Sequence, residues 1–256
     1  AQGINGLDKN LLNYVEKHNI FLIEDVCESH GVIVDKGKKG GTFGNLSCFS
    51  FYYAHHMSTI EGGMICTNDE NSYEALRMFR SHGMVREMLN TKKKNSWIEK
   101  YQDLNEKFIF TRPAFNVRNN EIGAIIGLEQ LKRLDSMVKK RAENFQLFLD
   151  LLPNWCFKDF NLEGQSNYAF NLILNEPDRE LMENLQLRLE KNGIEYRRGS
   201  AGGGNQMRQP YVRERYHFSE KDIKTIAPIT DHVHFYGMYI GNYPELDKAS
   251  IEEIVK

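Results

Sequence analysis

A pair of carboxylates at the end of a short apolar run is the first feature of this sequence that could do chemistry. The run Phe21-Leu22-Ile23 has the composition of a buried strand, and Glu24 and Asp25 follow it directly. Ligands of α/β proteins bind outside the carboxyl ends of parallel strands. Asp25 is therefore placed to pair with the ring nitrogen of a bound cofactor and to keep that nitrogen protonated. On this segment alone, a helix cap or a solvated loop is the more common role of an acidic residue that ends a strand.

A second segment, residues 48–63, combines two adjacent histidines with a hydroxyl and a glycine pair. It reads Cys-Phe-Ser-Phe-Tyr-Tyr-Ala-His-His-Met-Ser-Thr-Ile-Glu-Gly-Gly. Imidazole changes its charge near neutral pH, so His55 or His56 could act as an acid or a base. Ordinary loop histidines are the alternative for such a pair without further context.

The order of residues in this segment resembles the cofactor loop of the DegT/DnrJ/EryC1/StrS family of sugar aminotransferases. In that loop a Ser-Phe pair precedes a lysine, which stands five residues after the serine, and a Thr-Thr-x-Glu-Gly-Gly-like stretch follows. Ser50-Phe51 and the stretch from Ser58 to Gly63 match this frame without a gap, which puts His55 at the lysine position. Lysine binds the cofactor covalently, whereas histidine cannot, although it can still move a proton.

Histidine at this position is typical of one branch of the family, which removes the C3 hydroxyl of 4-keto-6-deoxy nucleotide sugars. The resemblance implies pyridoxal 5'-phosphate, working as pyridoxamine 5'-phosphate, with His55 as the catalytic base. It also implies a GDP-linked sugar, L-glutamate as the amino donor, and a 3-deoxy-4-keto sugar and ammonia as products. Such a product belongs to deoxysugar synthesis for the lipopolysaccharide O-antigen. An aminotransferase of the same family and a degenerate, non-catalytic member are the alternatives.

The segment 115–124, Phe-Asn-Val-Arg-Asn-Asn-Glu-Ile-Gly-Ala, resembles the Asn-x-Arg loop that precedes a long helix in the same family. The resemblance implies that Asn116 reaches the cofactor phosphate of a neighbouring subunit, and that Ser50 donates its hydroxyl to that phosphate. A homodimer with shared active sites follows from this assignment. A helix cap is the alternative for this segment, and it suits Asn119 better than Asn116.

Further candidates surround these positions. Ser29 and Glu28 follow Asp25 closely, and we expect them near the cofactor or the substrate. Arginine forks suit carboxylates and diphosphates, and glycines permit close backbone approach. The substrate candidates on these grounds are Arg198, Arg86, Arg118 and the loop from Gly202 to Asn205.

The fold that the resemblance implies is the α/β fold of pyridoxal-phosphate-dependent transferases, aspartate aminotransferase fold type I. We expect residues 1–147 to form a large cofactor-binding domain with a mostly parallel sheet, and residues 148–256 to form a small α+β domain. Apolar residues between 120 and 146 predict one long helix with a buried face. The match lacks the upstream part of the family's large domain, so we expect residues 1–147 to lack their N-terminal part.

Composition excludes several other classes of protein. The formal net charge is −2 and the isoelectric point is near 6.5, which gives no electrostatic case for nucleic acid or an anionic membrane surface. No apolar run is long enough to span a bilayer. Cys27, Cys48, Cys66 and Cys156 are too widely spaced for a zinc site or for the iron–sulfur cluster of a related dehydratase. We expect a cytoplasmic enzyme without a metal.

Overall fold

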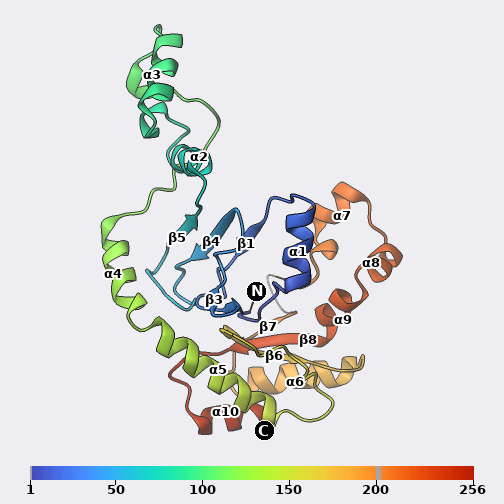
Figure 1. The fold of residues 1–256 in the computed structure, drawn as a ribbon. Coiled ribbons are helices and arrows are strands. Elements are labelled where there is room, and N and C mark those ends of the chain that lie inside the picture. Colours follow the sequence, from blue (N-terminus) through green and yellow to red (C-terminus); the bar gives the residue numbers. More distant parts are fainter. Residues whose placement is uncertain (1, 200–202) are drawn as a thin grey trace. The chain divides into compact units, whose positions relative to one another are not determined.

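The computed structural model describes residues 2–199 and 203–256, which group into two compact units. The first unit comprises Lys9–Cys27 and Gly40–Lys132, and the second comprises Ala1–Asp8, Glu28–Lys39 and Arg133–Lys256. Figure 1 gives the order of the elements along the chain. The boundary predicted between residues 147 and 148 falls inside a helix of the second unit, so the division into two domains at that point stays a prediction.

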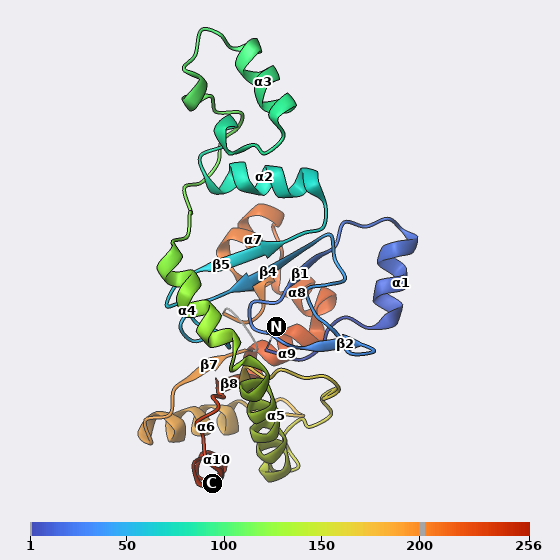
Figure 2. The same cartoon turned by 60° about the vertical axis from the view of Figure 1, so that its left-hand side comes forward.

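Three strands form the sheet of the first unit, in the order β1-β4-β5 (Figure 2). β1 (Ile23–Asp25) pairs in parallel with β4 (Leu46–Ser50), and β4 pairs antiparallel with β5 (Gly63–Cys66). The described strands of this unit thus form one parallel and one antiparallel pair. The chain returns from β4 to β5 through a loop without a crossover helix, and parallel pairing requires such a crossover.

The helices of the first unit follow its strands in the chain, apart from one that precedes them. Asp69 caps the helix after β5, because its side chain accepts a hydrogen bond from the Ser72 amide. Met78, Val85, Met88 and Ile109 form a small apolar cluster around this helix and the segments after it. The helical elements are α1 (Lys9–Lys17), α2 (Glu70–Arg80), η1 (Val85–Glu87), α3 (Thr91–Lys100), η2 (Glu106–Phe108) and α4 (Glu121–Leu131).

The long helix predicted for residues 120–146 is two helices, so that prediction is wrong in its continuity. α4 ends at Leu131 and α5 runs over Leu134–Leu151. The apolar face predicted to be buried is largely open on α4, where Ile122, Ile125 and Leu128 are 72%, 64% and 62% exposed. Periodicity shows which face would gain from burial, but it does not show that a partner covers that face.

An antiparallel sheet and several helices build the second unit. Its sheet has the order β6-β8-β7, and a separate hairpin joins two short strands. The strands are β6 (Ala169–Ile173), β7 (Tyr196–Arg198), β8 (Gly237–Gly241), β2 (Ile33–Asp35) and β3 (Lys38–Lys39). The helical elements besides α5 are α6 (Arg179–Lys191), η3 (Gln206–Arg208), α7 (Pro210–Tyr216), α8 (Glu220–Ile226), α9 (Pro228–Tyr236) and α10 (Lys248–Val255).

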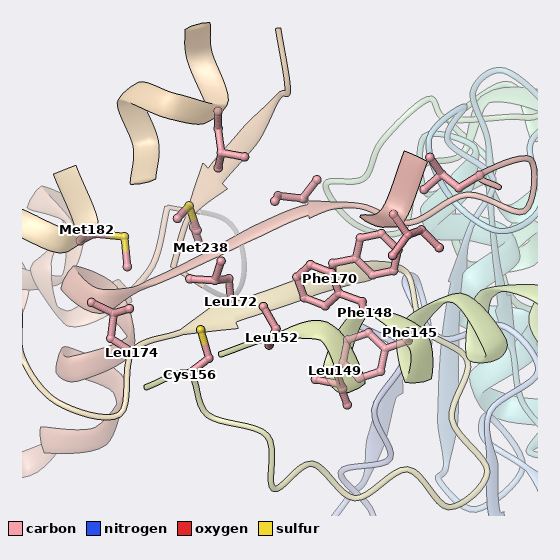
Figure 3. Packing of buried hydrophobic residues seen from close by; sticks show 14 residues of the cluster. Phe145, Phe148, Leu149, Leu152, Cys156, Phe170, Leu172, Leu174, Met182 and Met238 are labelled. Carbon is pink, nitrogen blue, oxygen red and sulfur yellow. The ribbon is translucent and has the colours of Figure 1, made fainter. Parts of the chain in front are cut away.

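Aromatic side chains form the centre of the second unit's core. Phe145 and Phe148 of α5 lie against Phe170 of β6, and the rings of Phe148 and Phe170 stack with centroids 4.5 Å apart (Figure 3). Met238 and Ile251 bring β8 and α10 into the same cluster. Alternation along β6 explains the pattern, since Phe170 and Leu172 point to the helices.

Candidate active site

Adjoining parallel strands bring Asp25 and Ser50 to the same end of the first unit's sheet. Asp25 ends β1 and is in register with Cys48 of β4, and Ser50 lies two residues further along β4. Since parallel strands have their carboxyl ends on the same edge, the two side-chain positions share the edge where α/β proteins bind ligands.

The environment of Asp25 keeps its carboxyl group ionised. Burial acts to raise its pKa, but the hydrogen bonds from Cys27, with smaller contributions from nearby positive charges, lower the pKa below its usual value. The Cys27 amide donates to Asp25 Oδ1 over 3.1 Å. The positive charge of His55 is a smaller cause that acts in the same direction.

Glu24, one residue before Asp25, fixes the loop beside it. Its carboxylate is buried, with 5% of the residue exposed, and accepts three backbone hydrogen bonds. Gly41 donates to Oε2 over 2.6 Å, and Phe43 and Gly44 donate to Oε1 over 2.7 and 2.6 Å. A buried charge stabilised by three amides ties the 41–44 loop to the end of β1 and so helps to hold Asp25 in place.

The loop after β4 presents His55 and buries His56. The Tyr52 amide donates to Ser50 Oγ over 3.3 Å, and the His55 amide donates to the Tyr52 carbonyl over 3.0 Å. The rings of Tyr52 and His55 meet edge to face with centroids 5.5 Å apart. His56 is only 1% exposed, whereas His55 is partly accessible. Of the two histidines, His55 is therefore the one that can meet a bound molecule.

A tight turn with unusual backbone angles closes this loop. Thr59 Oγ1 donates to the Glu61 carbonyl over 2.8 Å, and Ile60 has a left-handed φ of +74°, which is strained for a β-branched residue. Gly62 has φ +153°, and a Cβ there would lie 2.7 Å from Thr59 Oγ1 and 3.3 Å from Asn119 Nδ2. Gly62 thus leaves no room for a larger side chain. The segment that contains Asn119 packs against the turn.

The Asn-x-Arg segment lies in the first unit and presents its side chains to solvent. Asn116 forms a bridge with Ser81, and Arg118 Nε donates to Asn116 Oδ1 over 3.2 Å. Both side chains are exposed. Arg86 lies elsewhere in this unit, 3.6 Å from the Glu87 carboxylate and 5.7 Å from the centre of the Phe108 ring.

The remaining predicted residues belong to the second unit. Glu28 Oε2 accepts from the Gln2 amide over 3.2 Å, and Ser29 is buried. Arg198 is exposed on β7. The Asn205 side chain is buried and bonded within the unit, because it donates to Asp231 over 3.3 Å and accepts from the Met207 amide over 3.0 Å. Asn205 therefore has a structural role here, and its contact with substrate stays a prediction.

Gly202, the first residue of the predicted glycine loop, lies outside the described residues. The sequence did not indicate the ion pair that stabilises the neighbouring part of the second unit. Arg208 binds Asp231 through two contacts, of 2.5 and 2.9 Å, and Glu220 over 2.9 Å. Its guanidinium lies 4.6 Å from the centre of the Phe235 ring. The hydrogen bond from Arg208, acting against burial, lowers the pKa of Asp231. No local pattern links positions 208, 220 and 231.

Two kinds of site find no support in the described parts of the chain. Within residues 2–199 and 203–256, no group of three or more histidine, cysteine, aspartate or glutamate side chains could hold a metal ion. None of the helices placed by the structure has the length and apolarity that a bilayer crossing requires.

Known proteins resemble the chain over most of its length. The model of the DegT/DnrJ/EryC1/StrS aminotransferase family matches residues 8–256. GDP-4-keto-6-deoxy-D-mannose 3-dehydratase of Yersinia pseudotuberculosis is 33% identical over 232 residues, which are 89% of this chain and 57% of that protein. GDP-perosamine synthase of Vibrio cholerae is 28% identical over 255 residues, or 96% of this chain and 60% of that protein.

Solved structures agree with these sequence matches and confirm the transferase fold. GDP-4-keto-6-deoxy-D-mannose-3-dehydratase of E. coli, with bound hydrated PLP, superimposes with a TM-score of 0.77 at 29% identity. That match covers 100% of this chain and 65% of the other. The chain therefore spans between half and two thirds of the length of these relatives.

Proposed function

Because the chain belongs to the DegT/DnrJ/EryC1/StrS aminotransferase family, we propose that it works with pyridoxal 5'-phosphate as a 3-dehydratase of a GDP-linked 4-keto-6-deoxy sugar. One observation carries the proposal: the partly accessible His55 follows β4, and the parallel neighbour of β4, β1, ends in the Asp25 carboxylate. The names of the 33%-identical relatives support the choice of substrate. The chain covers 57% of those relatives, so the proposal concerns the protein to which this chain contributes.

The residues present fit the cofactor. Asp25, ionised and at the carboxyl end of β1, would pair with the ring nitrogen, and the Ser50 hydroxyl would bind the phosphate, as would Asn116 of a second copy. When bound, the cofactor supplies a protonated ring that accepts the electrons released as a neighbouring C–H bond breaks. Asp25 serves this chemistry by holding the proton on the nitrogen.

His55 carries the proton transfers in this proposal. Its imidazole takes up a proton as a base and donates one to the C3 hydroxyl, which leaves as water. Imidazole suits both directions because its charge changes near neutral pH. It has no primary amine that could hold the cofactor covalently, so the cofactor stays available to L-glutamate, which reloads its amino group.

The product distinguishes this activity from the aminotransferase alternative. The protein would be incubated with GDP-4-keto-6-deoxymannose, L-glutamate and pyridoxal 5'-phosphate, and both the sugar mass and ammonia would be measured. A 3-deoxy-4-keto sugar with released ammonia is the expected result. An amino sugar without ammonia would refute dehydration, and no cofactor absorbance in the purified protein would favour a non-catalytic member.

The homodimer belongs to the same proposal, and α4 supports it. Ile122, Ile125 and Leu128 recur at intervals of three residues and lie exposed on this helix, directly after the exposed Asn116 and Arg118. Burying each such side chain stabilises an association by about 1.5–3 kcal/mol. A second copy seated on this face would bring Asn116 to its partner.

We place the activity in the cytoplasm and in lipopolysaccharide biosynthesis. All four cysteines are free thiols in the structure, which a reducing compartment favours. One relative of the chain, from Salmonella typhimurium, is a lipopolysaccharide biosynthesis protein, 27% identical over 255 residues.

A further inference from the structure

The loop that carries His55 is closed at its base by two backbone hydrogen bonds. The Thr59 amide donates to the Phe51 carbonyl over 2.9 Å, and the Phe51 amide donates to the Gly62 carbonyl over 2.9 Å. Phe51 and Thr59 are both buried. Residues 52–58, which include both histidines, therefore leave the end of β4 and return to one bonded point. The place of that point limits where the His55 imidazole can lie.

Helix α4 packs closely against this base. A Cβ at Gly127 would lie 3.3 Å from Thr59 Cγ2, so close that Thr59 would have to move by a few tenths of an ångström. One turn earlier in the helix, Gly123 is buried, and a Cβ there would lie 3.2 Å from Asn119 Oδ1. The Asn119 side chain faces Gly62 as well as Gly123. The base of the loop and the first turns of α4 therefore share one tightly packed contact.

The glycines of this contact do not serve the helix itself. Gly123 and Gly127 both stand inside α4, where glycine is less favourable than any residue except proline because it loses the most backbone freedom on folding. Neither has a positive φ that would call for glycine. What glycine provides at position 127 is the absence of a side chain, which lets Thr59 approach the helix backbone. The contact with Thr59 thus explains a residue that helix propensity disfavours.

We propose that Gly127 and Thr59 are positioning residues for His55, because their contact holds the base of the loop against α4 and so sets the place of the imidazole. The proposal rests on the proposed function for the role of His55. It deepens that function by naming residues that act through His55 without touching the substrate. Misplacement of a reacting group by about 1 Å can lower a rate by about 100-fold. A movement of a few tenths of an ångström is therefore large enough to measure.

Two substitutions change this contact in opposite directions. Gly127→Ala adds a methyl group that crowds Thr59 Cγ2. Thr59→Ser removes Cγ2 but retains the hydroxyl that donates to the Glu61 carbonyl, so the turn keeps its hydrogen bond. The double variant exchanges one methyl group for another and leaves the volume of the contact nearly unchanged. If the two residues act through one contact, their effects will therefore not be additive.

The position of His55 can be measured without cofactor or substrate. Nuclear magnetic resonance of the cofactor-free protein gives a Cε1 resonance for each histidine, and the His55 signal is assigned by its absence in His55→Asn. The Tyr52 ring meets the imidazole edge to face, with centroids 5.5 Å apart. A small movement of His55 relative to this ring changes the ring-current shift of its resonance.

Both single variants are expected to move the His55 resonance, and the double variant is expected to return it towards its wild-type position. In the product assay, Gly127→Ala should lower kcat for ammonia release by about fivefold while KM for the nucleotide sugar stays unchanged. The double variant should recover most of that loss. Ala124→Gly, at an exposed position of α4, changes helix propensity alone and should leave the resonance in place. Thermal unfolding confirms that each variant is folded.

A His55 resonance that keeps its wild-type position in both single variants would overturn the positioning role. A displacement that the double variant does not reduce, or that Ala124→Gly reproduces, would also overturn it, because the contact would then not be the cause. If the wild type released no ammonia, the proposed reaction would fail. The resonance of the cofactor-free protein would still decide whether the contact positions His55, so the two proposals fail through different measurements.

Discussion

Replacing Glu24 by glutamine tests how the position of the site depends on one buried carboxylate. The side chain keeps its shape in Glu24→Gln, but one oxygen becomes an NH₂ group. The Phe43 and Gly44 amides donate to Oε1, and the Gly41 amide donates to Oε2. The glutamine would therefore turn its oxygen to the pair and set its NH₂ against the Gly41 amide, donor against donor.

The cost follows from these three bonds. A hydrogen bond to a charged group contributes about 1.5–3 kcal/mol, against about 0.5–1.5 kcal/mol for a neutral one. The variant loses the bond from Gly41 outright and converts the other two from charged to neutral. We expect the free energy of unfolding to fall by about 3 kcal/mol, because the unbonded Gly41 amide stays beside a donor.

Two measurements check this expectation. Urea unfolding followed by circular dichroism gives the change in stability, and titration with pyridoxal 5'-phosphate, followed by its absorbance, gives cofactor affinity. Both should decrease, since the 41–44 loop and Asp25 are attached to the same strand end. Glu99→Gln, an exposed acid of α3, is the matched control and should change stability by no more than about 0.5 kcal/mol. If Glu24→Gln behaved like this control, the carboxylate would not anchor the loop.

Three further predictions concern the site, the second unit and the assembly. His55→Lys should suppress dehydration while the cofactor becomes covalently bound, and wild-type release of ammonia from this variant would show that His55 does not decide the reaction. The pKa of Asp231 is lowered in the folded state by its hydrogen bond from Arg208. The ion pair therefore stabilises the fold fully at pH values above the ordinary pKa of 3.8. This stabilisation is lost as the pH falls through the lower pKa of the folded state. Asp231→Asn should therefore cost about 3 kcal/mol at pH 7 and flatten the acid limb of a stability-versus-pH curve, and an unchanged limb would contradict the pairing. Ile125→Glu should convert a dimer to monomer in sedimentation analysis without loss of helix content, whereas an intact dimer would exclude α4 from the interface.

Local chemistry explains what the sequence by itself determined. The strand that ends in Asp25, the serine at the end of β4 and the Thr-x-Glu-Gly-Gly turn all depend on residues within a few positions of one another. The order of residues therefore identifies the strand end, because an apolar run is followed by two acids. It also identifies the turn, because glycines stand where a side chain would have no room. The family frame added the register that selects His55 over His56, and burial of His56 agrees with that choice.

Tertiary structure alone decided the features that join distant positions. The Glu24 anchor and the pair Arg208–Asp231 each link residues 17 or more positions apart. Such contacts depend on how loops close and which side chains then meet, and the hydrophobic pattern of any single segment does not contain that information. The same limit explains α4, whose apolar residues are evident in the sequence. Whether the apolar residues of α4 are exposed depends on what packs against the helix, and the sequence of the helix alone does not show this.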